Sequence, residues 1–122
     1  MPTPQDMESE ITNDVLIIYL KGNLVAITTN DPLMYLITKH LEMGKKNVLF
    51  NLSDVKFMDS SGLNMLLKTF TKMRKIGGEM VLCNLSEQII ELTQITKLDT
   101  LFNQQPDEAS ALIFLTGSKS RN

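Results

Sequence analysis

Strand-like and helical patterns of apolar residues alternate along the chain, and the first two segments are strand-like. We predict strands over residues 6–11 and 15–21, joined by a tight turn at Thr12-Asn13-Asp14, because asparagine and aspartate tolerate turn conformations that branched residues avoid. The second segment holds the run Val-Leu-Ile-Ile-Tyr-Leu, which shows no polar alternation. Such a run predicts a strand buried on both faces, near the middle of a sheet.

A helical period begins near residue 32. Asn30 or Asp31 can cap a helix that starts at Pro32, since proline suits the first helical position. The apolar residues of this helix fall on one face: Leu33, Leu36, Ile37 and Leu41. Gly44 ends the helix, and residues 47–52 predict another buried strand.

The second half of the chain continues this alternation. From Ser60 onward apolar residues recur at helical spacing until Gly77-Gly78, at Leu63, Leu66, Leu67, Phe70 and Met73, and a strand is predicted over 79–85. Ser86 can cap a third helix whose inward residues are Ile89, Leu92, Ile95 and Leu98. Pro106 can open a last helix through Ala109, Leu112 and Ile113, and a short fifth strand near Leu101-Phe102 is an option.

This order of elements predicts an α/β fold, a mixed β-sheet of four to five strands covered by about four helices. Right-handed crossovers should make the later strands parallel. A chain of 122 residues is expected to form a single domain over 1–122, with its core at about 7–115 and a flexible tail at 117–122.

Composition excludes several classes of function. The net charge of -2 provides no positive field for nucleic acid, and no apolar run approaches the ~20 residues that span a bilayer. We therefore expect no nucleic acid partner, no membrane partner and a cytoplasmic location. The lone Cys83 is expected in the core, since it has no second cysteine with which to pair.

His40 is the only histidine, so the sequence offers no histidine cluster for a metal and no catalytic base near Ser60. We expect His40 to face solvent or to pack at a helix edge. The chain is accordingly predicted to be neither an enzyme nor the carrier of a cofactor or metal.

The segment Phe-Met-Asp-Ser-Ser-Gly-Leu, residues 57–63, lies between a predicted strand and the start of the long helix. Asp59 and Ser60 are both good helix caps, and Gly62 permits close approach of another chain segment to the first turn. Simple capping explains these residues on physical grounds alone, because polar residues often precede an apolar helix.

A wider match changes that interpretation. Residues 48–63, Val-Leu-Phe-Asn-Leu-Ser-Asp-Val-Lys-Phe-Met-Asp-Ser-Ser-Gly-Leu, resemble the signature of STAS domains, and most closely that of bacterial anti-sigma factor antagonists. The resemblance continues through residues 75–83, Lys-Ile-Gly-Gly-Glu-Met-Val-Leu-Cys, and the spacing of the elements fits from about residue 7 to residue 115.

The resemblance implies a partner switch centred on Ser60. In that family, the first serine of the Asp-Ser-Ser-Gly motif is phosphorylated by a GHKL-type serine kinase that is also an anti-sigma factor. The unphosphorylated protein binds this kinase, and a PPM-type phosphatase resets the phosphorylated form. Ser61 is the competing phosphoacceptor, and the oligomeric state expected is a monomer.

The sequence departs from the family in the loop after the second strand. The family usually has Gly-Glu-Leu-Asp there, whereas this chain has Gly22-Asn23-Leu24-Val25, so the acid is absent. This puts the partner contact in doubt. The alternatives are a divergent kinase, an adaptor whose output is not a sigma factor or that is not phosphorylated, and a sensor of a small ligand.

The predicted partner-binding surface surrounds the motif. It comprises Asn23, Val25, Met58, Asp59, Ser60, Ser61, Gly62 and Lys68. Met58 is considered either as core filler or as an exposed, adaptable contact. Lys68 belongs to a basic stripe with Lys72 and Lys75, which is either a solvated face or a rim for an acidic partner.

Overall fold

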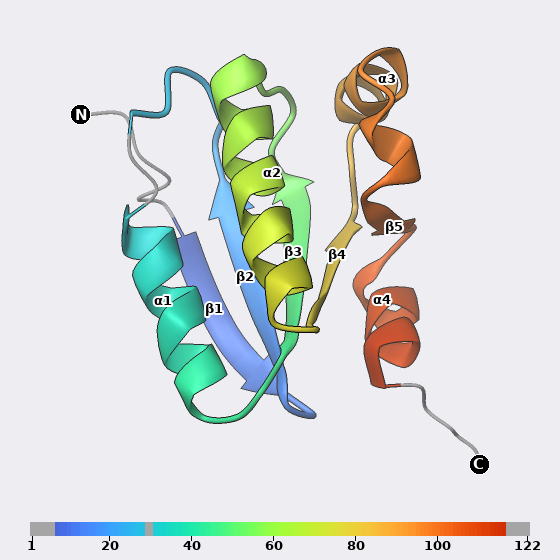
Figure 1. The fold of residues 1–122 in the computed structure, drawn as a ribbon. Coiled ribbons are helices and arrows are strands. Elements are labelled where there is room, and N and C mark those ends of the chain that lie inside the picture. The colour runs from blue at the N-terminus through green and yellow to red at the C-terminus, as the bar shows by residue number, and fades with distance from the viewer. Residues whose placement is uncertain (1–6, 29–30, 117–122) are drawn as a thin grey trace.

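The structure is a computed structural model that describes residues 7–28 and 31–116 of the chain. Five strands form one sheet in the order β1-β2-β3-β4-β5, in which β1 is antiparallel to β2 and the other neighbours are parallel (Figure 1). The elements are β1 (Met7–Thr12), β2 (Val15–Lys21), α1 (Asp31–Glu42), β3 (Asn47–Asp54), α2 (Ser60–Lys75), β4 (Glu79–Cys83), α3 (Glu87–Ile95), η1 (Leu98–Thr100), β5 (Asn103–Gln105) and α4 (Glu108–Thr116). The predicted α/β fold with a mixed sheet is confirmed.

The hairpin of β1 and β2 has the predicted turn. Asn13 and Asp14 adopt left-handed backbone conformations, with φ of 52° and 66°, which asparagine and aspartate tolerate better than branched residues. β2 lies between β1 and β3, and residues 15–18 are at most 2% exposed. The predicted burial of this strand on both faces is therefore confirmed.

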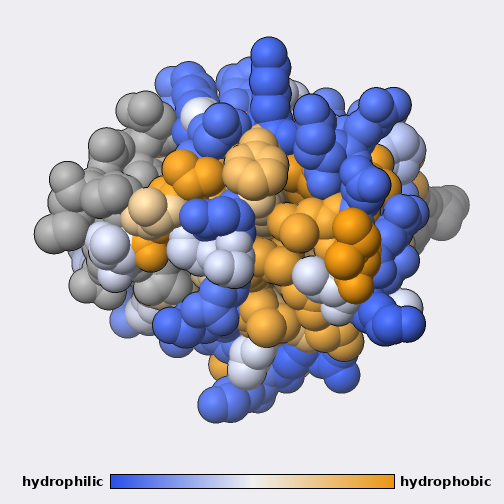
Figure 2. All heavy atoms as spheres, turned by 90° about the horizontal axis from the view of Figure 1, so that it is seen from above, coloured by the Kyte–Doolittle hydropathy of each residue, from blue (hydrophilic) through white to orange (hydrophobic). Residues whose placement is uncertain are grey.

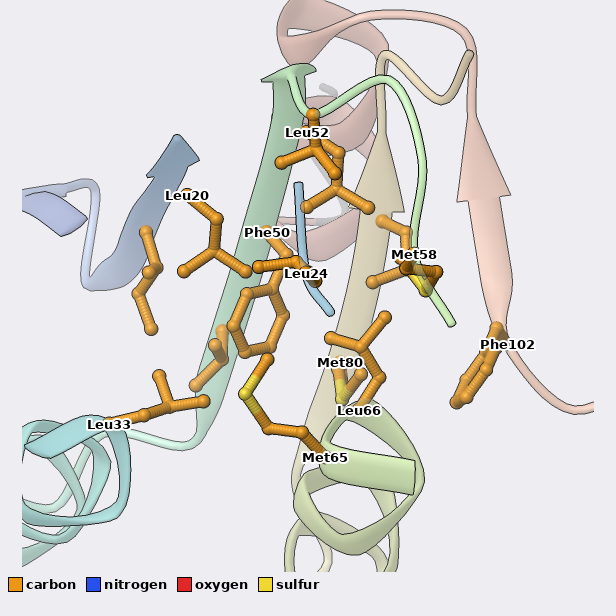
Figure 3. Close-up of a cluster of buried hydrophobic side chains, with 14 of the residues drawn as sticks. Leu20, Leu24, Leu33, Phe50, Leu52, Met58, Met65, Leu66, Met80 and Phe102 are labelled. Carbon is orange, nitrogen blue, oxygen red and sulfur yellow. The ribbon is translucent and has the colours of Figure 1, made fainter. Parts of the chain in front are cut away.

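The two faces of the sheet are covered unequally. Helices α1 and α2 lie over one face, where the larger cluster of buried side chains is centred on Phe50 (Figure 3). α4 covers part of the other face, where Val15, Leu49, Cys83 and Ala111 belong to a smaller buried cluster. Cys83 is fully buried, as expected.

Several predictions about the later elements need correction. Ile95, predicted to face inward, is 71% exposed. The reason is that α3 ends at Ile95 and the chain turns at Lys97, whose φ is 65°. Leu98 consequently lies in the separate turn η1. β4 ends at Cys83, β5 lies just after the predicted 101–102, and α4 begins at Glu108, after Pro106.

The prediction that His40 faces solvent is wrong; of the two alternatives, it is the packed position near the end of α1 that the structure has. His40 is 1% exposed, and its Nε2 lies 3.1 Å from the carbonyl oxygen of Asn47, which joins the last turn of α1 to the start of β3. The predicted start of β1 at Asp6, the cap at Asn30 and the tail 117–122 lie outside the described residues, as does the side chain of Asp31.

Candidate functional site

Two loops run side by side at the carboxyl ends of the parallel strands. The first comprises residues 22–28 after β2, and the second comprises residues 55–59 before α2. The amide of Leu24 donates to the carbonyl of Phe57, and the amide of Asp59 donates to the carbonyl of Leu24, both at 3.1 Å. The side chain of Asn23 accepts a further bond from the amide of Phe57. These bonds fix the first loop against the start of α2.

Of the two residues predicted as possible caps, Asp59 is the N-cap of α2, and its carboxylate accepts from four donors. It accepts from the amides of Ser61 at 2.9 Å and Gly62 at 3.3 Å, and from the hydroxyl of Ser61. It also accepts from the amide of Ala26 at 3.0 Å, across the two loops. These bonds, led by the one from the Ser61 hydroxyl, lower the pKa of Asp59 to about 2.

Adjacent serines of the motif have different environments. The hydroxyl of Ser61 is part-buried, donates to Asp59 and accepts from the amide of Ile27 at 2.8 Å. Ser60 is the first residue of α2 and is exposed, and its hydroxyl makes no hydrogen bond within residues 7–28 and 31–116. An enzyme that modifies the surface therefore finds a free hydroxyl at Ser60 and an engaged one at Ser61.

Gly62 provides the close approach that the sequence predicted. A Cβ at this position would lie 2.5 Å from the carbonyl oxygen of Leu24 and 2.7 Å from the Leu24 Cβ, closer than real contacts allow. The approaching segment belongs to the chain itself. Gly62 and Ser61 thus act through the internal packing of the site, since Gly62 is buried.

Met58 is not an exposed contact. Its side chain is 1% exposed and points into the core beside Leu24 and Leu66 (Figure 3). Of the two alternatives for Met58, core filler is confirmed and the exposed partner contact is wrong, because the parallel bridge between Leu24 and Met58 turns both side chains inward. The alternation places Phe57 outward, and its side chain is 48% exposed.

The remaining members of the predicted surface lie on the outside. Asn23, Val25 and Lys68 are exposed, and Val25 stands in the loop that contacts Asp59. Figure 2 shows this end of the molecule from above, with apolar residues gathered at its centre and hydrophilic residues around them. Sequence reasoning missed Phe57 as an exposed apolar side chain beside the motif.

A comparison with known families identifies the family to which this chain belongs. A family model described as STAS domain matches residues 6–111. The chain belongs to the STAS domain family. Within the described residues, none of the helices is long and apolar enough to cross a membrane, and no group of His, Cys, Asp and Glu side chains is placed to hold a metal ion.

Two curated relatives of this STAS protein are named as anti-sigma factor antagonists. The chain is 44% identical over 52 residues to the anti-sigma-B factor antagonist of Bacillus subtilis (strain 168), a match that covers 43% of this chain and 48% of that protein. It is 27% identical over 106 residues to the anti-sigma F factor antagonist of Paenibacillus polymyxa, a match that covers 87% of this chain and 91% of that protein.

The STAS fold of this chain also resembles solved structures. SpoIIAA in its unphosphorylated form aligns with a TM-score of 0.64 and 20% identity, over 88% of this chain and 94% of that one. The Bacillus cell fate determinant SpoIIAA in the phosphorylated form aligns with a TM-score of 0.65 and 22% identity, over 87% and 96%. These likenesses establish the fold.

Proposed function

We propose that this STAS protein is an anti-sigma factor antagonist that works by partner switching in the cytoplasm. Unphosphorylated, it binds a GHKL-type serine kinase that is also an anti-sigma factor; phosphorylated at Ser60, it releases that kinase until a PPM-type phosphatase resets it. The chain itself performs no catalysis. The names of the two curated relatives support the anti-sigma factor partner.

The observation that carries the proposal is the difference between the two serines. Ser60 is exposed at the start of α2 with an unengaged hydroxyl, whereas Ser61 uses its hydroxyl to join Asp59 to Ile27. A kinase needs an accessible hydroxyl, and removing the hydroxyl of Ser61 from its bonds would loosen the loop. The geometry therefore supports Ser60 as the phosphoacceptor.

The effect of a phosphate at this position follows from its charge. It would add about -1.5 to -2 charges next to the ionised Asp59, on a surface that docks a partner. A penalty of only ~3 kcal/mol on docking would weaken binding more than a hundredfold, since each 1.4 kcal/mol is tenfold. The solved structures of SpoIIAA in its phosphorylated and unphosphorylated forms both align with the fold of this chain, which supports a switch that acts on the surface without refolding.

A second candidate is a STAS adaptor whose output is not a sigma factor. It is favoured by Val25, which is 38% exposed where the family usually has an acid. A sensor that binds a small anion at the start of α2 has less support, because Asp59 already accepts from the amides of Ser61 and Gly62. Those amides are the donors that such an anion would need.

The test is a kinase assay read by intact-mass spectrometry and phosphosite mapping. The chain is incubated with ATP and the GHKL-type kinase encoded nearest to its gene, and wild type is compared with Ser60→Ala. We expect one phosphate that maps to Ser60 and is absent from the variant.

Two controls make the result decisive. The exposed serine Ser53 is changed to alanine, and this variant should be phosphorylated like wild type. The kinase is tested in parallel on a substrate that it is known to phosphorylate. A kinase that is active there but adds no phosphate to this chain would contradict the proposed switch and favour an adaptor that is not phosphorylated. Modification of Ser61 instead would contradict Ser60 as the phosphoacceptor.

A further inference from the structure

Two apolar side chains stand outside the core on the loops that flank Ser60. Phe57 is 48% exposed and Val25 is 38% exposed, although each is next to a buried residue in the sequence. The bridge between Leu24 and Met58 explains this, because it turns Leu24 and Met58 inward and leaves their neighbours on the outside. Phe57 and Val25 therefore share the outer surface of the two joined loops.

The backbone beneath both side chains is fixed by hydrogen bonds. The amide of Phe57 donates to the side chain of Asn23, and its carbonyl accepts from an amide of the first loop, both at 3.1 Å. Val25 precedes Ala26, whose amide donates to the carboxylate of Asp59 at 3.0 Å. A partner that docks on these side chains therefore has little backbone to put in order, which lowers the cost of binding.

The surface around these side chains offers a partner little charge. The first loop, Gly-Asn-Leu-Val-Ala-Ile-Thr, has no ionisable side chain. The carboxylate of Asp59 accepts from four donors within the chain, and Lys56 is the other charged residue of the second loop. Figure 2 shows apolar residues at the centre of this end and hydrophilic residues around them. Such a surface suits an apolar contact at its centre, with polar contacts at the rim.

We propose that Phe57 and Val25 form an apolar anchor through which the chain binds its serine kinase, and that the kinase meets them with an uncharged apolar pocket. The anchor rests on the proposed function, because a kinase that modifies Ser60 must cover the surface beside it. Aromatic side chains on a fixed backbone often dominate the affinity of protein interfaces. A phosphate on Ser60 would stand beside a contact that excludes water, so docking would have to strip water from the phosphate.

The direct test is the affinity of the unphosphorylated chain for the GHKL-type kinase of the phosphorylation assay, measured by isothermal titration calorimetry without ATP. Phe57→Ser removes the ring, and Val25→Asp places a charge in the apolar contact, so each should weaken binding by about tenfold or more. Phe57→Leu keeps an apolar side chain and should weaken binding by less than about threefold.

Helix α4, which covers the other face of the sheet, provides matched controls. Phe114 is 44% exposed and Ile113 is 59% exposed. Phe114→Ser and Ile113→Asp make the same kinds of change on exposed apolar side chains far from α2, and kinase binding should stay at the wild-type level. All of these variants should unfold near the wild-type urea midpoint, because every altered side chain is already at least 38% exposed.

Salt distinguishes an apolar anchor from a charged one. Raising the NaCl concentration from about 50 mM to about 500 mM screens exposed charges but leaves an apolar contact intact. The affinity for the kinase should therefore change by less than about threefold. A loss of more than about tenfold would show that charges dominate the contact and would overturn the anchor.

The variants can overturn the anchor independently of the switch. Binding of Phe57→Ser and Val25→Asp at the wild-type level, or an equal loss in the α4 controls, would contradict it. Phosphate mapping to Ser60 is a separate result, so an anchor that fails while Ser60 is phosphorylated contradicts only this inference. If the wild-type chain does not bind the kinase, the proposed function fails and the anchor fails with it.

Discussion

The two ends of the parallel strands are built by different means. At the carboxyl end, the site end, an ionised Asp59 accepts from the amide of Ala26 in the first loop and from the amide and hydroxyl of Ser61 in α2, and Ser60 is exposed. At the amino end, the opposite end, His40 is buried and contacts the carbonyl of Asn47, and the amide of Glu79 donates to the carbonyl of Lys46. The site end is thus held by backbone bonds and a hydrogen-bonded carboxylate near the surface, and the opposite end by a buried histidine, backbone bonds and the ion pair of Lys45 with Asp14.

This difference has a consequence for function. A charge that is fully hydrogen-bonded can hold a loop in place without covering the surface, so a neighbouring hydroxyl stays accessible. A buried imidazole that bonds a neighbouring carbonyl holds two elements together inside the fold, where its polar atoms are out of reach of a partner. The site end therefore combines a fixed backbone with an exposed serine, whereas the histidine of the opposite end is enclosed by the fold.

The largest effects are expected from two glycines, one at each end. A Cβ at Gly62 would lie 2.5 Å from the carbonyl oxygen of Leu24, and a Cβ at Gly78 would lie 2.5 Å from that of Lys46. Gly62→Ala and Gly78→Ala should each lower the free energy of unfolding by about 3 kcal/mol, measured by urea denaturation, because neither carbonyl can move freely.

The comparison predicts that these two variants differ in function. Gly62→Ala displaces the loop that borders Ser60, so the rate of Ser60 phosphorylation should fall. Gly78→Ala, with a similar loss of stability, should leave that rate near wild type under conditions in which both variants are folded. Equal rates in the two variants would show that the site end does not depend on the packing at Gly62.

Acid should weaken the opposite end first. Burial, more than the nearby Lys45, lowers the pKa of His40 from 6.5, while the bond to Asn47 and the charge of Asp14 act in the other direction. The imidazole is neutral when folded, and its buried Nδ1 has no hydrogen-bond partner among the described residues. The contribution of the neutral imidazole to the stability of the fold is therefore fully present above pH 6.5, and it is lost as the pH falls from 6.5 toward the lowered pKa of His40.

The measurement is the urea midpoint at pH 7.5 and at pH 5.5. Wild type should lose stability between them, and His40→Gln, which cannot titrate, should lose less, because His40 is the only histidine of the chain. The same loss in both proteins would show that the acid sensitivity originates elsewhere.

The site end should respond at lower pH. The pKa of Asp59 is lowered to about 2 from 3.8, so its contribution is present above pH 3.8 and is lost as the pH falls toward 2. Asp59→Asn should melt at a lower temperature than wild type at pH 7 and should lack the component of the acid transition between pH 4 and pH 2. Circular dichroism at a series of pH values measures both, and an unchanged acid transition in the variant would show that other carboxyls dominate it.

Much of this architecture could be predicted from local sequence. The turn at Asn13-Asp14, the unbroken apolar run of β2 and the cap at Asp59 each depend on residues close to one another in the chain. Gly62 was also predicted correctly as a point of close approach. These features follow from local backbone preferences and periodicity, which the sequence displays directly.

Features set by distant contacts could not be predicted in this way. The inward position of Met58 and the outward position of Phe57 depend on a bridge to Leu24, more than thirty positions away, in a loop with no period of its own. The burial of His40 depends on the carbonyl of Asn47 across a turn. Ile95 fits the helical period of α3, but the helix ends before the core can cover it.

The smallest effects distinguish the two serines, and they bear most directly on the function. Ser61→Ala removes the acceptor of the Ile27 amide and one donor to Asp59, so it should lower the free energy of unfolding by about 1 kcal/mol. Ser60→Ala removes an exposed hydroxyl without a bond within the described part of the chain and should change stability by less than about 0.5 kcal/mol. Urea denaturation of the two variants checks this order. If Ser60→Ala cost as much as Ser61→Ala, the Ser60 hydroxyl would be engaged in the fold, and its accessibility to a kinase would no longer follow from the structure.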